Sequence, residues 1–158
     1  KYHHRVPFVK ALADSCMRNA SNRGHVTTLL GRKCRFNLFE PRGQRNIPLA
    51  YPEASEKWGE ENIVRSYTYK ALNRLIQGSA ADMTKKAMVD LYKEGYVPHV
   101  QVHDELDISV ETKQQAKEIK EIMENCVQLE VPNLVDAELG TTWGNATTSY
   151  EEAFNERD

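Results

Sequence analysis

Apolar residues at three- and four-residue steps predict an amphipathic helix near the start of the chain and a longer one in the middle. In the first helix, Pro7 fits the first turn and Gly24 fits the C-cap position. Its apolar stripe is Val6, Val9, Leu12, Ala13, Cys16, Met17 and Ala20. The second is expected over residues 66–93 and ends at Gly95. Its expected core stripe is Leu72, Ile76, Ala80, Met83, Ala87 and Leu91.

Near the C-terminus the pattern predicts a further helix and then a strand. Thr112 and Gln115 have the spacing of a capping box, which marks a helix start. The stripe that follows is Ala116, Ile119, Ile122, Met123, Cys126 and Val127, and Pro132 lies beyond its end. Alternating apolar residues at 135, 137 and 139 predict a final strand. The acidic residues 151–158 are expected to form a loose tail.

Two segments have the alternation and turn residues of β-hairpins. In the first, residues 26–30 and 34–38 flank a turn at Gly31 and Arg32. In the second, residues 100–102 and 106–110 flank a polar corner at 103–105, which reads His-Asp-Glu. Between the first hairpin and the long helix, residues 40–66 contain three prolines and are predicted to be an irregular connector with one short helix near 53–58.

Composition is that of an ordinary globular domain, with 40% hydrophobic and 28% charged residues. Net charge is −2, so a nucleic-acid partner would have to be bound by a local basic patch. The longest apolar runs are too short for a membrane span. The three cysteines are far apart and form no CxxC or Cys/His cluster typical of zinc, and they suit a reducing interior better than a disulfide framework. Because the first residue is Lys rather than Met, a fragment or a processed piece is expected.

Three groups of polar residues are candidates for function, and each has a plain structural alternative. Carboxylates at the 103–105 corner suit Mg²⁺, although Asp is also a common turn residue. The basic residues Arg32, Lys33 and Arg35 suit phosphates or a solvated turn. Beside the core stripe, Tyr69, Asn73 and Gln77 follow one another at four-residue steps. They would form either a specific contact surface or the ordinary polar flank of a helix. Next to them, the small residues 78–81 would let another backbone or a nucleic acid approach closely.

In order, these segments resemble the C-terminal part of family A DNA polymerases, the group of bacterial DNA polymerase I and related phage replicative enzymes. Residues 23–32 are similar to the family's Gly-(Tyr)-Val-x-Thr-(Leu)-x-Gly-Arg segment, and residues 71–82 to its Asn-x-x-x-Gln-Gly-Thr/Ser-Ala-Ala-Asp helix. Gln-Val-His-Asp-Glu at 101–105 is the family's motif C, and residues 138–143 resemble its closing Gly-x-x-Trp. Only the 40–66 connector and the tail lie outside the match.

The resemblance implies a template-directed DNA polymerase that uses two Mg²⁺ ions to join a dNTP to a primer 3′-hydroxyl. It implies that Asp104 is a metal ligand and that Glu105 is a weaker or indirect metal contact. His103 would contact the primer end.

The same resemblance implies contacts to the primer–template duplex. Asn73 and Gln77 would donate to the minor-groove acceptors, which lie in similar places for every correct base pair. Tyr69 would join them where the family often has Arg or His. Arg32, Lys33 and Arg35 would contact the DNA backbone.

The fold expected from the resemblance is α+β, part of a polymerase palm whose hairpin and terminal strand pack against long helices and are completed by residues outside this chain. Residues 1–66 would be the end of the fingers with the basic ribbon and the connector, and residues 67–150 the C-terminal palm. The family's other metal-binding aspartate, its fingers helix and its thumb are absent, so an upstream polymerase polypeptide is an expected partner, as in a split polymerase. The expected location is the cytoplasm of a bacterial or phage-infected cell.

Two other functions remain open from the sequence. One is a non-catalytic DNA-binding accessory module derived from a polymerase palm. The other is a metal-dependent nuclease built around Asp104, Glu105 and Asp107.

Overall fold

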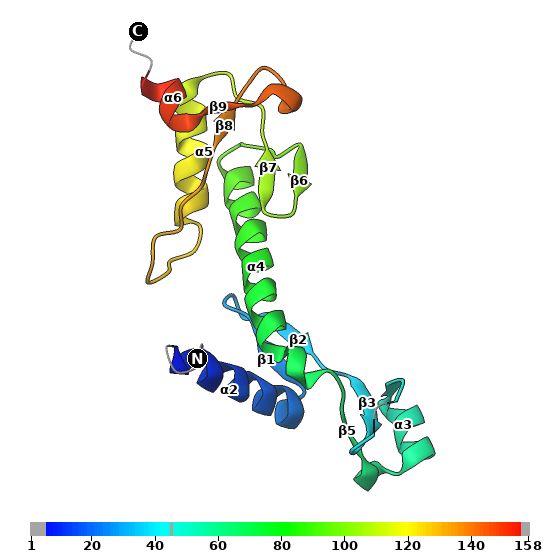
Figure 1. Ribbon diagram of the computed structural model, residues 1–158. Coiled ribbons are helices and arrows are strands. Elements are labelled where there is room, and N and C mark those ends of the chain that lie inside the picture. The colour runs from blue at the N-terminus through cyan, green and yellow to red at the C-terminus, as the bar shows by residue number, and fades with distance from the viewer. Residues whose placement is uncertain (1–5, 45, 156–158) are drawn as a thin grey trace. The chain divides into compact units, whose positions relative to one another are not determined.

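Short antiparallel sheets and helices make up the α+β fold seen in the computed structural model, which describes residues 6–44 and 46–155 (Figure 1). The chain divides into two compact units, one ending at Asp82 and the other beginning at Met83. The boundary lies inside helix α4 (Ala71–Lys93).

Helix α2 (Pro7–Arg23) opens the first unit and confirms the predicted helix. Pro7 is in its first turn, and Gly24 at the C-cap has φ 73°, a left-handed conformation that glycine adopts without steric cost. Of the apolar stripe, Cys16 and Ala20 are buried, whereas Leu12 and Met17 are about 40% exposed.

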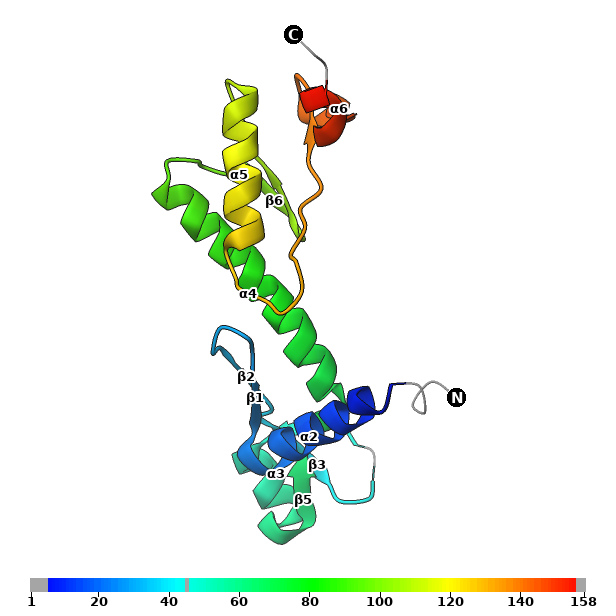
Figure 2. The same ribbon diagram turned by 90° about the vertical axis from the view of Figure 1, so that its left-hand side faces the viewer.

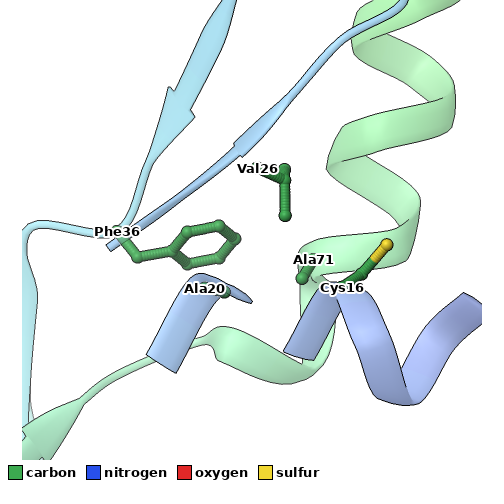
Figure 3. Packing of buried hydrophobic residues seen from close by; sticks show 5 residues of the cluster. All are labelled: Cys16, Ala20, Val26, Phe36 and Ala71. Carbon is green, nitrogen blue, oxygen red and sulfur yellow. The ribbon is translucent and has the colours of Figure 1, made fainter. Parts of the chain in front are cut away.

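The core of this unit forms where α2 meets an antiparallel ribbon. Strand β1 (His25–Thr27) pairs with β2 (Lys33–Arg35), which confirms the first predicted hairpin. The buried side chains come from α2, the ribbon and the start of α4, and they pack together in Figure 3. They are Cys16, Ala20, Val26, Phe36 and Ala71.

The connector is ordered, so the prediction of an irregular 40–66 segment is wrong. Strand β3 (Leu38–Pro41) lies between β4 (Leu49–Ala50) and β5 (Ile63–Arg65). Helix α3 (Tyr51–Trp58), expected near 53–58, lies beside this sheet and leads into the 3₁₀ turn η1 (Glu60–Asn62) (Figure 2). Periodicity within a short window cannot reveal a sheet whose strands are separated by a helix.

Helix α4 begins later than predicted and is only partly buried. Tyr67 has φ 59°, which interrupts helical geometry, and the 3₁₀ turn η2 (Thr68–Lys70) precedes Ala71. Ala87 and Leu91 are buried as expected, but Ile76 is 53% exposed and Ala80 is exposed too. Helical spacing shows that these positions share a face, but it does not show how much of that face the chain covers.

The second hairpin and the helix that follows it belong to the second unit. Strand β6 (Val100–Val102) pairs with β7 (Glu105–Asp107), so the second arm is shorter than the predicted 106–110 run and starts one residue earlier. Helix α5 (Lys113–Asn125) has the predicted capping box, and it buries Ala116 and Ile119.

The C-terminal segment is more ordered than the sequence indicated. The predicted final strand is confirmed only at β8 (Glu138–Leu139), which pairs with β9 (Thr148–Ser149) around the 3₁₀ turn η3 (Trp143–Asn145). Helix α6 (Tyr150–Asn155) replaces the expected loose tail as far as residue 155, because Ala153 is buried and Tyr150 stacks on Phe154. Residues 156–158 lie outside the described residues. No helix within 6–44 and 46–155 is long and apolar enough to cross a membrane.

Replacing Thr112 by Ala is expected to destabilise the second unit by about 1 kcal/mol, the usual cost of losing a side-chain N-cap. The Thr112 hydroxyl accepts from the Gln115 N–H at 3.2 Å, and Ala leaves that donor without this acceptor. Urea unfolding followed by Trp143 fluorescence in a Trp58→Phe background measures the change. Thr112→Ser keeps the hydroxyl and should stay close to the parent; equal losses for Ser and Ala would contradict the capping explanation.

Candidate active site

The turn of the β6–β7 hairpin presents an acidic side chain at its tip. Pairing of Val102 with Glu105 leaves His103 and Asp104 as a two-residue turn. His103 has φ 54°, a left-handed conformation that His enters more readily than most residues. The Gln101 amide Nε2 donates to the His103 carbonyl at 2.9 Å and braces the corner. Asp104 is exposed, with its carboxylate on a backbone-paired support.

Glu105 begins β7 and has a partner from the C-terminal turn. The Trp143 indole Nε1 donates to Glu105 Oε1 at 3.2 Å. Asp107 lies two residues further on the same face of β7. It is half-buried, and its Oδ2 has no hydrogen-bond partner within the described residues.

The donor chemistry of the hairpin suits Mg²⁺, but the described residues do not complete a metal site by themselves. Asp104 and Glu105 supply the hard oxygen ligands that Mg²⁺ prefers. Within 6–44 and 46–155, no group of three or more His, Cys, Asp or Glu side chains could hold a metal ion.

Arg32 of the basic ribbon is engaged with the chain itself. Its Nε donates to Asp82 at 2.7 Å, and its terminal nitrogen donates to the Gly78 carbonyl at 2.9 Å. The hydrogen bond that Arg32 donates to Asp82 raises the pKa of Arg32 above its ordinary value. Of the predicted backbone contacts, Lys33 and Arg35 are exposed, whereas the Arg32 guanidinium holds the ribbon to α4.

Asp82 is the residue that sequence reasoning missed. It is 7% exposed and accepts from the Thr28 hydroxyl at 2.5 Å as well as from Arg32. One turn earlier in α4, the Ser79 hydroxyl accepts from the Leu29 N–H at 3.0 Å. The small residues of α4 therefore admit another backbone, as expected, and that backbone is the turn of the ribbon. A lone Asp among small residues of a helix was the available signal.

Asn73 and Gln77 are exposed on α4, four residues apart and so on one face. Tyr69 is 66% exposed but belongs to the 3₁₀ turn, so the predicted regular four-residue file does not extend to it. Its ring packs edge-on against Tyr67 with centroids 6.4 Å apart, and Lys70 lies over both rings. These residues belong to the first unit, and the acidic hairpin belongs to the second.

The structure thus has three features in the chain order of the family's motifs. They are an Asn/Gln face on α4, a two-residue His-Asp turn and a Glu directly after that turn. The family model described as DNA polymerase family A matches residues 1–145. The chain belongs to this family.

Known family members include curated polymerases from phage and bacteria. A DNA-directed DNA polymerase of Pseudomonas phage M6 is 41% identical over 145 residues, covering 92% of this chain and 19% of the phage protein. DNA polymerase I of Bacillus caldotenax is 35% identical over 156 residues, covering 92% of this chain and 16% of the relative. The chain thus spans less than a fifth of the length of these relatives.

A solved structure agrees with the assignment. The polymerase domain of Pol1 from M. smegmatis, in complex with a DNA primer-template and dNTP, matches with a TM-score of 0.58 and 29% identity. The match covers 83% of this chain and 22% of that one. The resemblance read from the sequence is therefore confirmed at the level of the family and of an α+β polymerase fragment.

Proposed function

We propose that this chain supplies the C-terminal part of a template-directed DNA polymerase, which transfers a nucleotide from dNTP to a primer 3′-hydroxyl. The observation that carries the proposal is the acidic tip of the β6–β7 hairpin in a chain of this family. Residues 67–150 would form the C-terminal palm, and residues 1–66 would contain the end of the fingers.

In this proposal Asp104 and Glu105 hold two Mg²⁺ ions together with an aspartate outside the chain. When bound, the metal pair would lower the pKa of the primer hydroxyl and neutralise charge at the reacting phosphorus. Asp104 supplies an oxygen ligand from a rigid turn, and Glu105 supplies a second one or orients a bound water. His103, in the same turn, contacts the primer end. The backbone pairing of the hairpin keeps these side chains at a constant spacing.

The duplex would be held by polar groups that do not read sequence. Asn73 and Gln77 offer amide donors for minor-groove acceptors, and Tyr69 adds an exposed ring and hydroxyl before them. Of the three basic residues predicted to contact the DNA backbone, Arg32 binds Asp82, and the exposed Lys33 and Arg35 would make the contact. The solved polymerase complex with primer-template DNA and dNTP supports both partners.

Activity would require polymerase residues that precede this segment in the family. The relatives are more than five times as long as the part that this chain matches, and the resemblance puts the second metal-binding aspartate, the fingers helix and the thumb in that earlier part. That portion would lie on the same polypeptide or on a separate one, as in a split polymerase. Without it the chain would lack half of the metal ligands.

Primer extension with Mg²⁺ and all four nucleotides tests the proposal. We expect activity only when this chain and the upstream portion are present together, and none from either one alone, since each supplies part of the metal site. An upstream portion that extends primers by itself, with unchanged DNA binding when this chain is added, would contradict the proposal. If this chain instead only tightened DNA binding without affecting catalysis, the accessory-module alternative would be correct.

A further inference from the structure

The Trp143 indole N–H donates to Glu105, one of the three acidic residues of the β6–β7 hairpin. Its Nε1 lies 3.2 Å from Glu105 Oε1, across 38 positions of the sequence. In this chain the side chain is 63% exposed, so burial of the ring does not explain its position. We propose that Trp143 is a positioning residue that fixes the orientation of the Glu105 carboxylate, an inference that rests on the proposed function.

The turn that carries Trp143 is held by a network of hydrogen bonds. Asn145 Oδ1 accepts from the Thr142 backbone N–H at 2.7 Å and from the Thr142 hydroxyl at 2.9 Å. Asn145 Nδ2 donates to the Thr141 hydroxyl at 2.9 Å. A Cβ on Gly140 would come within 2.4 Å of the Asn145 carbonyl oxygen, so only glycine allows the two ends of the turn to approach this closely.

The base of this turn is closed by strand pairing. Leu139 pairs with Thr148 and Glu138 with Ser149, and these pairs join β8 to β9. The turn is therefore a rigid support rather than a loose end, and it places the Trp143 indole donor on the hairpin. A donor on a rigid support restricts the side chain that accepts from it.

The chemistry of the pair suits positioning rather than ligation. An indole N–H is a donor only and cannot bind a cation. By occupying Oε1 it leaves Glu105 Oε2 for a metal or for a metal-bound water. An exposed glutamate otherwise samples several rotamers, and each of them directs the carboxylate elsewhere. Donors of this kind orient the ligands at metal sites, and their loss typically weakens metal affinity or activity.

The contact itself is tested by NMR on the 158-residue chain, without any polymerase assay. The chain has two tryptophans, and Trp58→Phe assigns the indole N–H signal of Trp143. Glu105→Gln is expected to move that signal, because the carboxylate acceptor is replaced by an amide. The matched control Glu111→Gln removes the same charge from another exposed position of this unit and should leave the signal in place. The inference would be overturned if the Trp143 indole shift did not change in Glu105→Gln, or if it changed equally in Glu105→Gln and Glu111→Gln.

The functional consequence is tested in the polymerase that contains this chain and its upstream portion. Trp143→Phe keeps a large ring but removes the donor. We expect it to raise the Mg²⁺ concentration for half-maximal extension by about tenfold, the lower end of the range for a lost outer-shell partner. The KM for dNTP and the Kd for DNA should not change. Trp58→Phe, in α3 of the other unit, is the control that should leave Mg²⁺ dependence unaltered.

The outcomes separate this inference from the function on which it rests. If Asp104→Asn abolishes extension while Trp143→Phe leaves the Mg²⁺ dependence unchanged, the positioning role is wrong and the polymerase assignment stands. If Asp104→Asn keeps full activity, the proposed function fails, and the positioning role fails with it. An increased Mg²⁺ requirement for Trp143→Phe with unchanged substrate binding supports both.

Discussion

Asp104→Asn is expected to reduce the rate of primer extension by at least about 100-fold, the loss typical of removing one preorganised group that stabilises developing charge. Asn keeps the size of the side chain and is favoured in turns, so the two-residue corner should persist. What disappears is the negative oxygen that would hold Mg²⁺. A 100-fold loss corresponds to about 2.7 kcal/mol of transition-state stabilisation.

Single-turnover extension kinetics in the polymerase that contains this chain measure this effect. Fluorescence anisotropy of the same primer–template shows that DNA binding is retained. Asp136→Asn is the matched control, because Asp136 is an exposed aspartate of the same unit outside the hairpin. A rate for Asp104→Asn equal to that of Asp136→Asn would remove Asp104 from the metal site and favour the accessory module.

Features set by neighbouring residues were predictable from the sequence. Pro7 and Gly24 mark the two ends of α2, because the backbone preference of each residue is local and does not depend on distant parts of the chain. Thr112 and Gln115 begin α5 because their hydrogen bonds span only three residues. The hairpin at 100–107 also follows from local alternation, with one difference: Glu105 is already in β7 rather than in the corner.

Features that depend on distant pairing were not predictable. The β3–β5 pairs join residues on either side of α3, and no periodicity within either strand reports them. The bond from Thr28 to Asp82 crosses 54 positions, and the bond from Trp143 to Glu105 crosses 38. In each case a polar residue has a partner that only the folded chain brings close. The candidate acids were therefore found from their motif, whereas the groups that support them were not.

The roles of the site residues remain predictions, and the structure alters what one of them can do. Lys33 and Arg35 stay exposed on β2, as a phosphate-binding surface requires. Arg32 is half exposed, yet two of its nitrogens bind Asp82 and the Gly78 carbonyl. The Arg32–Asp82 ion pair orients the ribbon turn, so the backbone that carries Lys33 and Arg35 is held in place.

Asp82→Ala is expected to destabilise the first unit by about 2–3 kcal/mol, the range for a buried polar network that loses its central acceptor. Most of this cost comes from Thr28, which is 4% exposed and would keep a buried hydroxyl without its carboxylate acceptor. Arg32 contributes less, because its side chain is 47% exposed and water can replace the lost contact. The ribbon turn, with Lys33 beside it, would then lose its main link to α4.

Urea unfolding of the Asp82→Ala chain in a Trp143→Phe background measures the change, since Trp58 then reports on the first unit alone. The matched control is Asp14→Ala, which removes an exposed i,i+4 partner of Lys10 in the same unit. It should cost no more than about 0.5 kcal/mol, as exposed helical ion pairs do. Equal losses for the two variants would show that the buried network adds nothing beyond a surface ion pair. A large loss for Asp82→Ala alone would show that this carboxylate holds the ribbon to α4, and so supports the basic residues of β2 that we propose as DNA contacts.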